Sequence, residues 1–198
     1  MSGAAAMAPF VAAPDTERRQ PQVDSIVAEI SVQRIEANIR KLVSFKTRHT
    51  MSETESDTVG IGAARRWIKS EMERCGAGKL GVQFQSHLHP VANRISRPTD
   101  IVNVVATLPG TQAASRDRYY VVSGHYDSRV TDVMNATADA PGADDDASGT
   151  AAVMEMACVM SRHKFDASLV FMTVAAEEQG LYGSGDYAAK AKAAGMNI

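Results

Sequence analysis

Several features that mark specialised classes of protein are scarce in this sequence. Two cysteines in 198 residues are too few for a small scaffold held together by disulfides. No apolar stretch approaches the roughly 18 uncharged residues that a membrane-spanning helix needs. The 21 Lys and Arg residues are interleaved with 23 Asp and Glu residues, so no continuous basic stripe could follow a phosphate backbone. We therefore predict a globular domain without a membrane span and without nucleic acid as a partner.

The two cysteines, Cys75 and Cys158, are far apart in the sequence; Cys158 falls in a predicted apolar helix, and Cys75 continues the apolar spacing of another predicted helix. A free cysteine in such a position behaves as a small hydrophobic residue. The sequence therefore predicts two buried free thiols.

Residues 1–22 carry Ala, Pro, Gln and Arg without apolar periodicity, which is typical of a disordered leader. Two interpretations stay open. Residues 1–13 are small and apolar, and Val11-Ala12-Ala13 loosely fits an export cleavage site, which slightly favours a secreted or periplasmic location. However, no Lys or Arg precedes Arg18, and Pro14 would follow the cut, as in an unstructured tail. The compartment is not decided by these residues.

The remaining residues, 23–198, show the periodicities of a folded domain. Apolar residues at three- and four-residue spacing predict helices, and runs of branched or apolar residues predict strands. The expected helices cover about 23–42 (as one or two), 61–75, 147–160 and 184–193, and the expected strands cover 82–87, 101–108, 119–123 and 169–176. Asp57 and Thr58 are candidate caps at the start of the second helical segment, and Gly76 is its candidate end.

The order of elements from residue 101 onward is strand, strand, helix, strand, helix. This order predicts an α/β fold with three layers, α/β/α, around a mainly parallel, mixed central sheet. The sequence stops at Ile198, where the next strand of such a sheet would begin. We therefore expect 23–198 to be the N-terminal portion of a domain whose sheet is incomplete at its C-terminal end. Such an exposed sheet edge after 169–176 would favour self-association.

Three polar patches follow predicted strands, at the end of the strand where ligands collect in α/β sheets. In SGHYDS at 123–128, His125 and Asp127 are two residues apart and point to the same side, so His125 could bind a metal that Asp127 orients from behind. The alternative is a chance triplet with no function.

The second patch, PGADDDASG at 141–149, ends a long loop without periodicity, 129–146, and places three carboxylates side by side. Their repulsion needs a cation or a helix N-terminus to offset it. The alternative is that Asp144 or Asp146 caps the following helix and the others are solvated.

The third patch, AAEEQGLYGS at 175–184, follows the most hydrophobic predicted strand. Glu177 and Glu178 would face opposite sides, so that one binds a metal while the other handles a proton. The alternative is an acidic pair at the start of a helix. Together, the three patches supply imidazole nitrogen and carboxylate oxygen, which is the mixed ligand set of a catalytic zinc site.

In content and order, the three motifs GHYDS, PGADDDASG and AAEEQGLYGS resemble those of the two-zinc aminopeptidases of the bacterial leucyl aminopeptidase and aminopeptidase Y family. The segment LVSFKTRHT at 42–50 also resembles members of this family. The resemblance covers about 100–195 and implies a peptidase that removes residues from peptide or protein N-termini.

The resemblance also implies a role for each motif residue. His125 would bind one zinc ion, Asp145 would bridge two, and Glu178 would bind the other. Glu177 would be the general base, and Asp127 would orient His125. Asp146 would support the loop of Asp145 or cap the helix.

The family also uses a further Asp beyond the glutamate pair and a late His, and this chain ends before either. Each zinc ion would then keep two of the three protein ligands that are usual for catalytic zinc. Two alternatives therefore stay open. The chain could be an inactive fragment, or a half-domain that needs a partner, or its activity could be that of a related carboxypeptidase or single-zinc cyclase.

Overall fold

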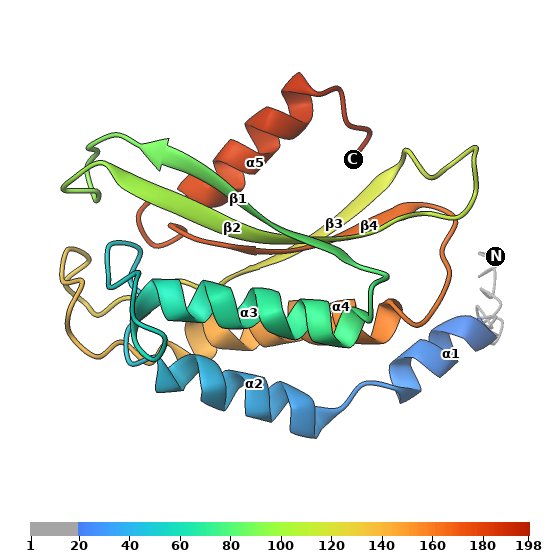
Figure 1. Ribbon diagram of the computed structural model, residues 1–198, viewed down its shortest axis with the longest axis horizontal. Helices are drawn as coiled ribbons and strands as arrows, with labels where there is room; N and C mark the ends of the chain where they lie inside the picture. Colours follow the sequence, from blue (N-terminus) through green and yellow to red (C-terminus); the bar gives the residue numbers. More distant parts are fainter. Residues whose placement is uncertain (1–19) are drawn as a thin grey trace, which may run out of the picture.

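A four-stranded sheet with helices on both faces forms the protein, in a computed structural model that describes residues 20–198 (Figure 1). The expected leader, 1–22, lies almost wholly outside the described residues. The helices are α1 (Pro21–Ala28), α2 (Val32–Ser44), α3 (Gly60–Gly76), α4 (Gly149–Met160) and α5 (Tyr182–Ala193), with a π-helical turn η1 (Ala143–Ser148) before α4. The strands are β1 (Gly81–His89), β2 (Thr99–Leu108), β3 (Tyr119–His125) and β4 (Ser168–Val174).

The strands lie in the order β1-β2-β4-β3. This confirms the prediction of an α/β fold with a mixed sheet. The sheet is less parallel than expected, because among the described strands only β3 and β4 pair in parallel, while β1–β2 and β2–β4 are antiparallel. The physical reason is the connections: β1 and β2 are joined by a short loop, whereas α4 provides the crossover that a parallel β3–β4 pair needs.

The edges of the sheet are β1 and β3, since β4 lies between β2 and β3. At the start of β3, the Tyr119 N–H donates to the carbonyl of Asn197, at 2.8 Å. Self-association through an edge stays a prediction. None of the helices in the described part of the chain has the length and hydrophobicity that crossing a bilayer requires.

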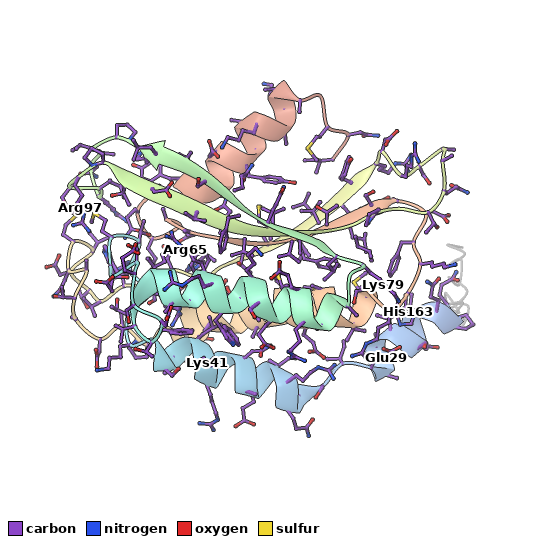
Figure 2. All side chains as sticks on the ribbon, viewed as in Figure 1. Glu29, Lys41, Arg65, Lys79, Arg97 and His163 are labelled. Atoms are coloured by element: carbon purple, nitrogen blue, oxygen red, sulfur yellow. A yellow bond between two sulfur atoms is a disulfide. The ribbon has the colours of Figure 1, made fainter. Side chains whose placement is uncertain are left out.

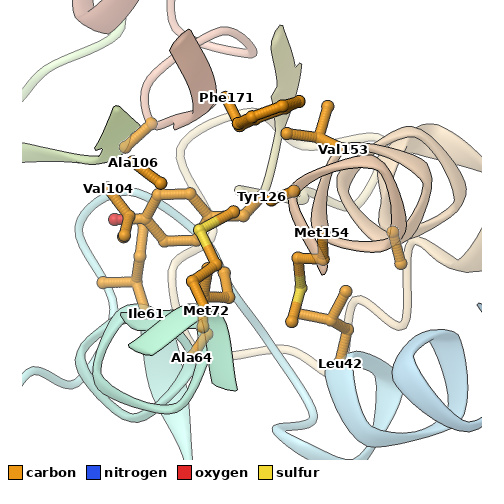
Figure 3. Close-up of a cluster of buried hydrophobic side chains, with 14 of the residues drawn as sticks. Leu42, Ile61, Ala64, Met72, Val104, Ala106, Tyr126, Val153, Met154 and Phe171 are labelled. Carbon is orange, nitrogen blue, oxygen red and sulfur yellow. The ribbon is translucent and has the colours of Figure 1, made fainter. Parts of the chain in front are cut away.

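The main core lies between the sheet and helices α2, α3 and α4, which cover one face, while α5 covers the other (Figure 1). At the centre of this core, Tyr126 is fully buried among side chains of α3 and β2, including Met72 and Val104 (Figure 3). Its hydroxyl donates to the Val102 carbonyl at 2.6 Å. Because Tyr126 follows β3 directly, its burial fixes the backbone on either side, where His125 and Asp127 lie.

The expectation of two free thiols is wrong. Cys75, at the end of α3, and Cys158, near the end of α4, form a disulfide with their Cα atoms 5.2 Å apart. Apolar periodicity identified both positions as facing the protein interior, but it holds no information about which helices face each other. The two helices lie side by side (Figure 1), and this brings the cysteines together.

The start of α3 also differs from the expectation. Val59 occupies the N-cap position without a side-chain hydrogen bond, so neither Asp57 nor Thr58 caps the helix. The hydroxyl of Ser52, from the preceding loop, accepts from the Ile61 N–H at 3.0 Å instead. The end at Gly76 is confirmed.

Buried charge ties the N-terminal helices to α4. Glu155 of α4 is 2% exposed and accepts hydrogen bonds from the Ser31 N–H at 2.7 Å and from Nε of Arg34 at 2.8 Å. Figure 2 shows Glu29, at the end of α1, beside His163, whose Nε2 lies 2.8 Å from the Glu29 carboxylate. These contacts hold the N-terminal helices against α4, the helix that follows the acidic residues of η1.

Candidate metal centre

The parallel pairing of β3 and β4 brings two of the sequence motifs to one edge of the sheet. In the register of these strands, His125 is opposite Val174. The residues that follow each strand therefore emerge together, and Glu177 and Glu178 lie near Asp127.

Asp127 connects the two strand ends. Its side chain is fully buried. Oδ1 accepts from the Glu177 N–H at 3.3 Å and Oδ2 accepts from the Glu178 N–H at 3.2 Å. Nδ1 of His125 lies 3.2 Å from the carbonyl oxygen of Asp127 and 3.5 Å from its Oδ1. Asp127 thus faces the Nδ1 side of the imidazole and leaves Nε2 to point into the site.

The acidic loop reaches the same place from the start of α4. Asp146 accepts from the His125 backbone N–H at 3.0 Å through Oδ2 and from the Gly149 N–H at 2.8 Å through Oδ1. The peptide bond between Asp145 and Asp146 is cis. A Cβ on Gly149 would lie 2.3 Å from Oδ1 of Asp146, so the approach needs glycine at this position. Asp145 is turned outward, with its side chain 74% exposed.

Nε2 of His125 faces two carboxylates, Oδ1 of Asp145 at 2.9 Å and Oε2 of Glu177 at 3.9 Å. Burial lowers the pKa of His125, but Asp127, Asp146 and Glu177 outweigh this effect and raise that pKa to about 9. Burial raises the pKa of Glu177. The charge of His125 lowers this pKa and the neighbouring carboxylates raise it, and the net shift is upward. A carboxyl group with a raised pKa accepts a proton more readily than an ordinary carboxylate, which suits it to take up a proton and return it.

Glu178 points elsewhere in this structure. Its carboxylate is buried and pairs with Nε of Arg129 at 2.6 Å, and its carbonyl accepts from Nη1 of Arg94 at 3.1 Å. Within residues 20–198, no three His, Cys, Asp or Glu side chains surround one point at which a metal ion could be held. The structure therefore brings His125 and Asp145 together, with Glu177 close by.

Sequence reasoning did not identify Arg129, Thr50 or Gln179 as part of the site. Thr50 lies 3.4 Å from Oδ2 of Asp127 through its hydroxyl, which also donates to the Gln179 side chain. Nε2 of His49, fully buried, lies 2.9 Å from the carbonyl oxygen of Val133. The position of these residues was the available signal, because Arg129 directly follows one motif and Gln179 lies within another, directly after the glutamate pair.

Comparison with known proteins decides the family. Residues 103–198 match the sequence profile described as Peptidase family M28. This segment belongs to peptidase family M28. The matched M28 residues include all three motifs that carry the resemblance noted in the sequence.

The curated relatives include a probable zinc metalloprotease of Leptosphaeria maculans, which is 50% identical over 182 residues. The alignment covers 90% of this chain and 42% of the relative. The chain thus spans about two-fifths of the length of this curated relative.

Solved structures share the fold of this chain. LapB from Legionella pneumophila superposes with a TM-score of 0.67 at 24% identity, over 93% of this chain and 46% of LapB. Glutaminyl cyclase from Porphyromonas gingivalis superposes with a TM-score of 0.59 at 19% identity, over 79% of this chain and 49% of the cyclase. Both matches support the α/β fold with a mixed sheet.

Proposed function

We propose that this M28 chain carries the catalytic half of a zinc-dependent aminopeptidase, which hydrolyses the first peptide bond of peptides. One observation carries the proposal. Nε2 of His125 is directed at the carboxylates of Asp145 and Glu177, while Asp127 engages the opposite side of the ring. The matches to a probable zinc metalloprotease and to peptidase family M28 support the same chemistry.

The donor set fits a zinc ion. A neutral imidazole that donates from Nδ1 to Asp127 presents a lone pair at Nε2, and the facing Oδ1 of Asp145 is also an acceptor, 2.9 Å away. Two facing acceptors require a cation between or beside them, either a proton or a metal. Imidazole nitrogen and carboxylate oxygen are usual zinc ligands. We propose that His125 and Asp145 would hold one ion and that Asp145 and Glu178 would hold a second, for which the Glu178 carboxylate has to leave Arg129.

The chain's own residues then handle the proton and the substrate. Zinc, when bound, supplies a Lewis acid that makes water more acidic and a peptide carbonyl more electrophilic. Glu177, whose pKa is raised by burial, takes the proton of the attacking water and returns it to the leaving amine. Asp127 fixes the His125 ring throughout. We expect the free α-amine of the substrate to bind beside the metal site, which would direct cleavage to the first peptide bond.

The test is zinc content together with hydrolysis of an aminoacyl 4-nitroanilide by the purified 198-residue chain. Glu177→Gln should keep the zinc content and lower turnover by about 100-fold or more, as expected for loss of a general base. Glu36→Gln, an exposed change on α2, is the matched control and should retain turnover. Unchanged turnover in Glu177→Gln would remove Glu177 from this role.

Two alternatives are separated in the same experiment. The fold shared with glutaminyl cyclases favours cyclisation as the second candidate, and release of ammonia from an N-terminal glutaminyl peptide would detect it. A carboxypeptidase would cleave a peptide whose N-terminus is acetylated. If the chain takes up no zinc and hydrolyses nothing, it is the inactive fragment or the partner-dependent half-domain.

A further inference from the structure

The side chain of Arg48, in the loop between α2 and α3, is fully buried. All its guanidinium nitrogens donate to backbone carbonyls. Nε donates to Tyr126 at 2.7 Å, and Nη2 donates to Gly142 at 2.9 Å. Nη1 donates to Leu42 at 3.1 Å and to Pro141 at 2.8 Å. Among the ion pairs of residues 20–198, none includes Arg48.

Three of the four carbonyls belong to the two segments that carry the proposed ligands. Tyr126 lies between His125 and Asp127, and the Pro141 and Gly142 carbonyls begin the turn that leads to Asp145. One guanidinium group therefore joins the end of β3 to the acidic loop. No other described side chain donates to both segments.

The backbone of the same loop strengthens the connection. The Arg48 N–H donates to the Ser128 hydroxyl at 3.1 Å, and the Ser128 N–H donates to the Arg48 carbonyl at 3.3 Å. Thr47 and Ala140 form a parallel bridge. Figure 1 shows these loops together at one end of the molecule, where the loop after α2 runs beside the loop after β3.

The group remains a cation despite its burial. Burial lowers the pKa of Arg48 to about 10, and the charges of Asp127 and Asp146 oppose that shift from a distance. A planar guanidinium can serve four carbonyls in different directions, whereas a lysine ammonium is a single point with three donors. Replacement would leave buried carbonyl groups without donors, and the segments would rearrange to find new ones.

We propose that Arg48 is a positioning residue that sets the placement of His125 relative to Asp145 and thereby builds the metal site. This proposal rests on the proposed function. Arg48 acts through the backbone of both segments and does not reach the ions or the substrate.

The first test is Arg48→Lys, measured by Co²⁺ titration of the metal-free chain. We expect Co²⁺ affinity to fall by about 10- to 100-fold, which is the usual effect of losing a partner that orients metal ligands, and the visible absorption of the Co²⁺ form to change. The double variant Cys75→Ala/Cys158→Ala is the control, because it weakens the fold away from this loop. It should retain the wild-type affinity and spectrum.

A second readout does not need metal. The His125 backbone N–H donates to Asp146 and thus reports the contact between the strand end and the acidic loop. Its hydrogen exchange, measured by NMR on metal-free protein relative to that of the Val104 amide in the middle of β2, should accelerate about tenfold or more in Arg48→Lys but not in the cysteine control. If Arg48→Lys does not fold, Arg48→Ala with added methylguanidinium replaces it, and the ligand should restore slow exchange.

The outcomes separate the two proposals. Wild-type affinity, spectrum and exchange in Arg48→Lys would overturn the role of Arg48. Absence of Co²⁺ binding by the wild-type chain would overturn the proposed metal function, while accelerated exchange in Arg48→Lys would still support the positioning role.

Discussion

In the metal-free protein, His125 should hold a proton that stabilises the fold and that zinc must displace. The perturbation is a rise in pH in the presence of a chelator. The ordinary pKa of histidine, 6.5, is raised to about 9 in the folded state. The difference of about 2.5 units, at about 1.36 kcal/mol each, corresponds to about 3 kcal/mol of stability.

The sign follows from the direction of the shift. Because the folded-state pKa lies above the unfolded-state pKa, the proton stabilises the folded protein fully below about pH 6.5. This contribution is lost as the pH rises from about 6.5 to about 9. At neutral pH, zinc binding should release about one proton from His125, because the metal needs the neutral imidazole.

Urea unfolding of chelator-treated protein measures the effect, with His125→Gln as the control that lacks this titration. The free energy of unfolding of the wild type, relative to the variant, should fall by about 3 kcal/mol between about pH 6 and about pH 9.5. Calorimetry of zinc binding in two buffers of different ionisation enthalpy counts the proton released. An NMR titration midpoint of His125 near its ordinary value, with a constant stability difference, would refute the reasoning.

Three further outcomes are expected. Replacing Cys75 and Cys158 by Ala should lower the free energy of unfolding by about 4.5 kcal/mol, from the loop entropy of an 83-residue separation, and a loss below about 1 kcal/mol in urea unfolding would contradict this expectation. Arg129→Gln leaves the buried carboxylate of Glu178 without its partner, so it should cost about 1 to 2 kcal/mol in metal-free protein and less with saturating zinc. Equal losses in both states would show that zinc does not compensate that charge. Glu155→Gln should cost about 2 kcal/mol in the same assay while zinc content is retained, and loss of zinc would mean that the α2–α4 contact reaches the site.

Most of the secondary structure could be predicted, because apolar periodicity in these segments is strong. The helix at 60–76 and the strand at 99–108 differ from their predicted bounds by one or two residues. The parallel placement of 119–125 beside 168–174 could be inferred from the intervening helix. This placement brings His125 to the same edge as the glutamate pair, as the motif positions indicated.

Other features depend on information that a single sequence lacks. The partner of Cys75 is determined by the packing of two helices, and the partner of Glu178 is an arginine from a loop without periodicity. Arg48 lies in a segment noted only for its resemblance to a family, and its burial could not be foreseen because an arginine in a loop is usually solvated. Each missed residue makes its defining contact with a segment distant in the chain.

Both carboxylate oxygens of Asp127 accept hydrogen bonds from the backbone that follows β4. The same carboxylate also lies beside the imidazole of His125, the last residue of β3. One residue therefore holds both strand ends of the proposed metal centre. A redesign that moves the His125 imidazole to suit another ion would also move Glu177 and Glu178. Metal preference in this scaffold should therefore be altered by replacing both strand ends together.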